Sequence, residues 1–185
     1  LSGCDLRDAN FEKADLSNAD LTGCRATGAR FHAANIEEMT ADEGQFEGCD
    51  FSRAQGPRCS FVEADIRGAN FGEAMLTGAD FGATNAAEAH FSRATLDEAS
   101  FEKAQANDAC FDGASLFSLR AAEGASFARC RLRGVQAAGS FWDDADLQDS
   151  DFTASDLSGA FFSGAQLFRA VLDHCDMAGG TLTKA

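Results

Sequence analysis

Small and large apolar residues alternate with a period of five along almost the whole chain. One residue in five is small, and the residue two places later is large and apolar, as in Cys4 and Leu6. Of 36 small positions from Cys4 to Gly180, 33 are Ala, Cys, Gly, Ser or Thr. Helices have a period near 3.6 and strands a period of two, so neither explains this spacing. The period instead predicts a rod in which the chain turns a corner every five residues and buries the same two positions on each side.

Several of these five-residue units carry a polar residue between the small and the large one. The units resemble the Ala-(Asp/Asn)-Leu-x-x motif of pentapeptide-repeat proteins, and the resemblance covers essentially the whole chain. It implies an all-β fold, a right-handed quadrilateral parallel β-helix with four units to a turn and two of every five residues buried. The units with the clearest match are Cys4-Asp5-Leu6, Ala14-Asp15-Leu16, Ala19-Asp20-Leu21, Ala64-Asp65-Ile66, Ala69-Asn70-Phe71 and Ala145-Asp146-Leu147.

The large positions, taken at every fourth unit, support four sides independently of the motif. One side is built almost entirely of phenylalanine from Phe11 to Phe111, and the opposite side contains Phe61, Phe81 and Phe101. The two sides between them are mostly Leu or Ile where they are large. We therefore expect two opposing aromatic stacks in a solenoid of about nine four-sided turns, each contacting only its neighbours.

The interruptions of the pattern are few, and we expect one domain over residues 1–185. Gly56 and Pro57 remove a large residue, which predicts an irregularity near 55–58. One extra residue, most simply Gly124, shifts the register and predicts a one-residue insertion near 122–124. Both ends are plain repeat, so we expect flanking segments, a partner, or a homodimer formed through an end face.

Charge and cysteine content limit the classes of partner and of compartment. The net charge of −15 and the pI near 4.4 argue against direct binding of nucleic acid, because phosphates are held by Lys and Arg. A partner protein with a basic surface fits better. No run approaches the roughly 20 apolar residues of a membrane span. The seven cysteines, an odd number scattered through the repeat, suit reduced thiols and predict a cytoplasmic protein.

Catalytic, cofactor and metal sites are not predicted. Six of the seven cysteines occupy the small inward position, where they replace Ala as small hydrophobic residues. Cys110 points outward and lies one turn from His90, but two ligands do not make a metal site. His32 and His174 have no matching nucleophile at a useful spacing, and no phosphate loop or dinucleotide fingerprint occurs. We expect a protein that is not an enzyme and that holds neither metal nor cofactor.

Acidic residues gather on one side of the predicted rod. Ten of the 30 acids occupy the Asp/Asn position that the motif prefers, and we expect those to be structural. Seven of the other 20 acids lie on one side and form a candidate acidic stripe, which either keeps the rod soluble or imitates the phosphate backbone of DNA. The stripe consists of Asp42, Glu43, Glu63, Glu102, Glu123, Asp143 and Asp144.

Outward aromatic residues near the C-terminal end form a candidate apolar contact patch. Phe141 and Phe161 are separated by four repeat units, one full turn, and should stack, with Phe168 and Val171 close to them in sequence. An exposed apolar cluster marks contact with something, either a partner or a neighbouring segment of the same protein.

Three functions are compatible with these features. The main expectation is a protein-interaction or scaffold rod. The alternative follows from the resemblance, because some similar proteins mimic DNA, bind type II topoisomerases such as DNA gyrase or topoisomerase IV, and protect them from poisons such as quinolones. A weaker alternative is an adaptor or targeting module of a secretion system or effector.

Overall fold

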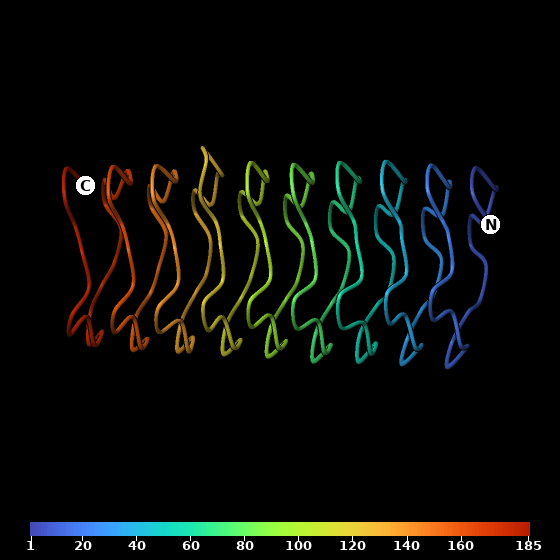
Figure 1. Cartoon of the computed structure of the whole chain (residues 1–185), viewed down its shortest axis with the longest axis horizontal. Coiled ribbons are helices and arrows are strands. Elements are labelled where there is room, and N and C mark those ends of the chain that lie inside the picture. Colours follow the sequence, from blue (N-terminus) through green and yellow to red (C-terminus); the bar gives the residue numbers. More distant parts are fainter.

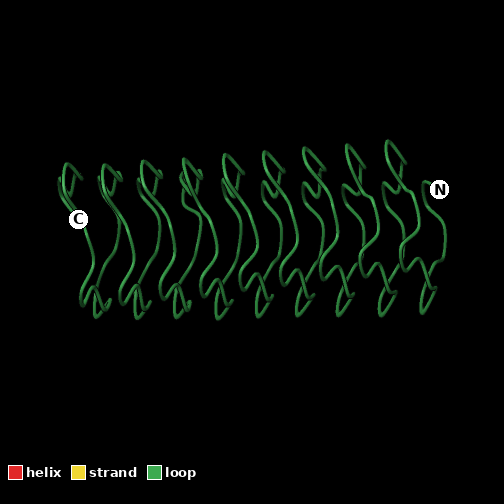
Figure 2. Cartoon of the chain, turned by 90° about the horizontal axis from the view of Figure 1, so that it is seen from below, coloured by secondary structure: helices red, strands yellow, loops and turns green.

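The chain forms one long coil whose two termini lie at opposite ends (Figure 1). This computed structural model describes all residues from 1 to 185. It contains no helix and no strand longer than one residue, which is why Figure 2 shows the whole chain as loop. Accordingly, no helical segment of sufficient length and apolarity to cross a membrane is present.

Isolated parallel bridges hold successive coils together. Asp5 pairs with Arg25 and Asn10 with Arg30, and every later bridge up to Ser100 with Arg120 keeps the same offset in sequence. Four bridging residues therefore occur in each coil, one on each of four walls. The expected all-β character is present only as these single-residue bridges, because the turn at the end of each wall occupies the rest of the five-residue unit.

The four walls are named here by the large residues at their centres, in chain order. Wall I contains Leu21, Phe61, Phe81, Phe101 and Trp142; wall II contains Leu6, Phe46, Ile66, Phe127 and Leu147; wall III contains Phe11, Phe51, Phe71, Phe91 and Phe152; wall IV contains Leu16, Ile36, Leu76, Leu96 and Leu157. Walls I and III face each other, and walls I and IV are adjacent. Each wall also has three outward positions, which we call the bridging position, the first turn position and the second turn position.

A tight turn ends every wall. The Ala9 N–H donates to the Leu6 carbonyl over 3.0 Å, and the same pattern recurs along the chain. The second turn position has a positive φ throughout, as a type II turn requires, whether it is Gly28 at 71° or Lys13 at 58°. This conformation costs a non-glycine residue about 1–2 kcal/mol. The N–H of such a residue bonds to the next coil, as from Lys13 to the His32 carbonyl over 2.9 Å, which helps to hold it there.

Phenylalanine rings fill the middle of the rod. On wall III, Phe51 and Phe71 stack with ring centroids 4.8 Å apart at an interplanar angle of 1°. Wall I meets wall III edge to face, as Phe61 meets Phe71 at 5.6 Å and 88°. Offset-stacked and edge-to-face pairs are the two favoured arrangements of aromatic rings, and each adds about 0.5–1.5 kcal/mol beyond burial. The core thus accounts for the phenylalanine content without any chemical role.

One additional residue is accommodated after Arg120. The bridge between Gln105 and Ser126 spans one residue more than the earlier bridges, and the bridge from Ser126 to Asp146 returns to the original offset. The turn there runs from the carbonyl of Ala122 to the N–H of Ala125, so the additional residue precedes the turn. At Gly56 the offset does not change, and the side chain of Ile36 occupies the space that a Cβ on this glycine would need.

Candidate interaction surface

Negative charge is concentrated on two adjacent walls. The outward positions of wall I carry nine acidic and three basic residues, and those of wall IV carry seven and one. These two walls therefore account for −12 of the net charge of −15. Wall III, opposite wall I, carries six residues of each sign and is neutral. The rod is thus acidic along one edge and not around its whole circumference.

Asp and Asn at the bridging position cap the turn of their own wall. The Ser17 N–H donates to Asp15 Oδ1 over 3.1 Å, and the Thr22 N–H donates to Asp20 Oδ1 over 2.9 Å. The hydrogen bond from the Ser17 hydroxyl keeps the pKa of Asp15 below its usual value, and bonds from Thr22 do the same for the pKa of Asp20. This capping is the physical reason for the Asp/Asn preference of the motif.

Where the bridging residue is neither Asp nor Asn, a residue of the preceding coil can supply the cap. Asp42 Oδ1 accepts the Val62 N–H over 3.0 Å and the Ser60 hydroxyl over 2.5 Å. Asp143 Oδ1 accepts the Ser163 N–H over 2.8 Å. Two members of the candidate acidic stripe, Asp42 and Asp143, are therefore turn caps. Three further turns use the same device, with caps from Asp97, Asn107 and Asp112.

The rest of the candidate acidic stripe divides into paired and unpaired carboxylates. Glu102 pairs with Arg120 at 3.2 Å, and Glu123 pairs with Lys103 at 2.9 Å. The hydrogen bond that Lys103 donates to Glu123 raises the pKa of Lys103. The three remaining members contact no cation of the chain and are exposed at second turn positions: Glu43, Glu63 and Asp144.

Wall IV adds carboxylates that the candidate stripe omitted. Glu37 and Glu38 both contact Arg58, at 3.1 and 2.8 Å, while Glu98 has no basic partner. The stripe was chosen on a single side of the rod. The step of four units that sorts the large residues onto walls also sorts the outward residues. It places Glu98 on wall IV, next to acidic wall I, from the sequence alone.

The candidate apolar contact patch is divided between walls. The rings of Phe141 and Phe161 stack on wall I at 5.0 Å and 4°, and the two residues are 37% and 39% exposed. Phe168 is 67% exposed in the turn of wall II, where the Arg169 guanidinium lies 5.4 Å from its ring centroid. Val171 is on wall III, bridged to Asp151. The structure brings together only the first pair.

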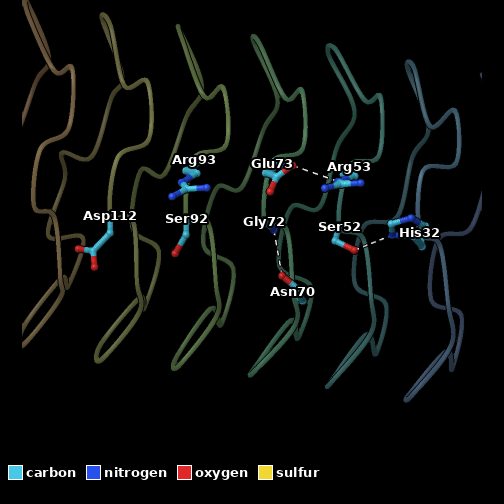
Figure 3. Close-up of a pocket in the computed structure, with 9 residues that line it drawn as sticks. All are labelled: His32, Ser52, Arg53, Asn70, Gly72, Glu73, Ser92, Arg93 and Asp112. Carbon is cyan, nitrogen blue, oxygen red and sulfur yellow. Dashed lines mark hydrogen bonds and ion pairs between the residues drawn. The ribbon is translucent and has the colours of Figure 1, made fainter.

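Wall III carries the histidines and a shallow polar groove of about 600 Å³ (Figure 3). His32 Nδ1 lies 2.8 Å from Ser52 Oγ, and Arg53 pairs with Glu73 of the following coil at 3.0 Å. No carboxylate contacts the His32 ring, and no group of three or more potential metal ligands occurs. The prediction that His32 has no nucleophile at a useful spacing was wrong, because Ser52 lies one coil away and contacts its ring.

Five of the seven cysteines are buried. Burial raises the pKa of Cys49 to about 12 and also raises the pKa of Cys59 and Cys130. Cys110, at an outward position, is nevertheless buried, with its sulfur 3.1 Å from Ser92 Oγ. All seven thiols are free.

The chain matches two protein-family models and is similar to solved structures. Residues 1–71 match the model of a pentapeptide repeat region, and residues 74–113, 125–164 and 145–183 match that of pentapeptide repeats (8 copies). The chain is similar to HetL, described as involved in heterocyst differentiation regulation in a Nostoc cyanobacterium. Their identity is 23% over 96% of this chain and 78% of HetL, with a TM-score of 0.65.

A second similar structure is trypsin-treated QnrB1, a plasmid-mediated fluoroquinolone resistance protein. It is 21% identical over 99% of this chain and 81% of its own, with a TM-score of 0.38. A search of curated proteins gave no match. These likenesses concern the fold alone.

Proposed function

The chain belongs to the pentapeptide-repeat proteins, whose fold is a right-handed β-helix, and on that premise we propose that it is a non-enzymatic rod that binds another protein. The partner presents a basic surface, and walls I and IV receive it. The proposal is for binding and not catalysis because the polar groups of the walls are used to cap turns and to pair with one another.

The observation that carries this proposal is the uneven distribution of charge. Walls I and IV hold −12 of the net charge, and their exposed carboxylates Glu43, Glu63, Glu98 and Asp144 have no cation of their own. Such a one-sided field attracts a basic surface and orients it toward one edge of the rod. Solubility alone would be served equally well by acids spread over all four walls.

The test compares two triple variants that lose the same charge. Glu43→Gln/Glu63→Gln/Glu98→Gln removes unpaired acids from walls I and IV, whereas Asp8→Asn/Glu88→Gln/Asp173→Asn removes unpaired acids from walls II and III. The probe in titration calorimetry is a lysine–glycine peptide. The first variant should bind this peptide at least about threefold more weakly than the wild-type chain does, because it loses three exposed contacts of about 0.2–1 kcal/mol each. Equal weakening in both variants would refute a preferred edge.

A second candidate function is mimicry of DNA toward a type II topoisomerase such as DNA gyrase. The continuity of carboxylates over two adjacent walls favours it, because a duplex also presents negative charge along its length. In a supercoiling assay with purified gyrase, the wild-type rod should compete with DNA and the wall I and IV variant should compete less well. Strong gyrase binding that both triple variants retain would show that this edge is not the surface involved.

A further inference from the structure

We propose that Phe141, Phe161 and Asp144 form an anchor for an arginine side chain of the partner protein. The inference rests on the proposed function of wall I and adds to it a recognition element of defined chemistry. On this wall the bridging positions before Phe141 are polar or charged, as at Ser60, Asp80 and Arg120. The two coils with phenylalanine therefore differ from the rest of the same acidic wall.

The two rings form a flat aromatic ledge. They stack at 5.0 Å and 4°, and each keeps more than a third of its surface in water. Phe161 has no second aromatic neighbour, since its bridge partner on the following coil is Thr181. The turn that leads into each ring is built of small residues, Ala138 and Gly139 before the first and Ser158 and Gly159 before the second. A partner backbone can therefore approach the ledge closely.

Two carboxylates follow the first ring in the same five-residue unit. Asp143 caps the Ser163 N–H, and Asp144 Oδ1 lies so close to Gly164 that a Cβ on this glycine would clash with it. Both acids thus reach the turn that directly follows Phe161. Asp143 and Asp144 are the two turn residues of the five-residue unit that contains Phe141, and this unit bridges to the unit of Phe161. Aromatic surface and an unpaired carboxylate consequently occur within one five-residue unit of wall I, three residues apart at Phe141 and Asp144.

A guanidinium group fits this combination better than an ammonium group does. It stacks on aromatic rings while its edge donates to a carboxylate in a fork, and it is more weakly hydrated than ammonium. The chain does not fill the site itself, because Arg120, the bridge neighbour of Phe141, turns to Glu102 at 3.2 Å. The chain also makes a related contact elsewhere, where Arg169 lies over Phe168 at 5.4 Å.

Charge complementarity favours a basic partner over a second copy of the chain. Two copies that met through wall I would each bring a net charge of −15, and their acidic edges would repel each other. An arginine-bearing segment removes that repulsion and covers the exposed rings in one contact.

The experiment measures the preference for arginine over lysine. Titration calorimetry at low ionic strength compares an arginine–glycine peptide with a lysine–glycine peptide of the same length. The wild-type chain should bind the arginine peptide about two- to fivefold more tightly, the range of a cation–π contact at an exposed site. Phe141→Ser/Phe161→Ser should remove this preference while the lysine peptide binds as before. Serine already occupies the bridging position at Ser60 and Ser100, so we expect this variant to fold.

Matched controls separate the anchor from general attraction. Phe168→Ser removes a more exposed ring from wall II and should leave the preference intact. Asp144→Asn should weaken arginine binding more than Glu63→Gln, which removes the same charge from the same wall away from the rings.

The outcomes distinguish the two proposals. Equal binding of both peptides by the wild-type chain would refute the anchor alone, as would a preference that survives Phe141→Ser/Phe161→Ser. Binding of neither peptide would refute the basic partner and the anchor together. A wild-type dimer in sedimentation that dissociates in the double variant would instead assign the ledge to a second copy.

Discussion

Replacing Asp42 should destabilise the rod, whereas replacing its neighbour Glu43 should not. The Asp42 carboxylate accepts the Val62 N–H over 3.0 Å and the Ser60 hydroxyl over 2.5 Å, while Glu43 contacts no cation. Capping hydrogen bonds of this kind contribute about 1–2 kcal/mol. For a domain of this size Asp42→Ala should therefore lower the melting temperature by about 2–8 °C. Glu43→Ala should change the free energy of unfolding by less than about 0.5 kcal/mol.

The matching rescue is Asp42→Asn. Asn107 performs the same task in another coil, where its Oδ1 accepts the Ser126 hydroxyl and the Ala128 N–H. The amide oxygen should therefore keep the cap and restore most of the lost stability, although the charge is gone. Thermal unfolding followed by circular dichroism measures all three variants. If Asp42→Asn were as unstable as Asp42→Ala, charge and not capping would explain the role of this residue, and the division of the acidic stripe would be wrong.

Three further measurements address the core, the caps and the thiols. Phe71→Ala should cost about 3–5 kcal/mol in urea unfolding and Phe11→Ala clearly less, because Phe71 is fully buried between stacked rings and Phe11 is half-buried near one end. Hydrogen bonds from Arg7 lower the pKa of Asp5 to about 2. The contribution of the Asp5 carboxylate to stability should therefore be complete above about pH 4 and should be lost as the pH falls toward 2. Urea unfolding at several pH values tests this dependence. Iodoacetamide at pH 8 should leave Cys49 unmodified in the native protein and alkylate it after unfolding, as mass spectrometry would show.

The core could be predicted from sequence because every coil repeats the same two inward positions. The step of four repeat units that sorted Phe51, Phe71 and Phe91 onto one side is the same step that the bridges take in the structure. In such a fold, the residue number of an inward side chain determines the wall and the coil on which it lies.

The surface could be predicted less well, because an outward acidic side chain can cap a backbone N–H, pair with a cation or face solvent. Asp42 and Glu43 are adjacent and both acidic, yet one caps the following coil and the other faces solvent. The signal was present in the sequence, since a bridging serine at position 60 leaves the turn after it without its own cap. Phe168 and Val171 were grouped with Phe141 by closeness in sequence, whereas two residues separated by a corner lie on different walls.

The additional residue before the Ala122–Ala125 turn shows that the rod absorbs a one-residue insertion within a single coil. The bridges resume their original offset one coil later, so the disturbance does not spread. Inserting one whole coil would move the Phe141 and Phe161 ledge along the axis by one strand spacing, about 4.8 Å, and keep it on the same wall. Inserting a single five-residue unit would rotate it by one wall, away from the unpaired carboxylates of the N-terminal half. The number of whole coils between two contact points thus sets their distance along the axis, and the number of additional five-residue units sets the walls on which they lie.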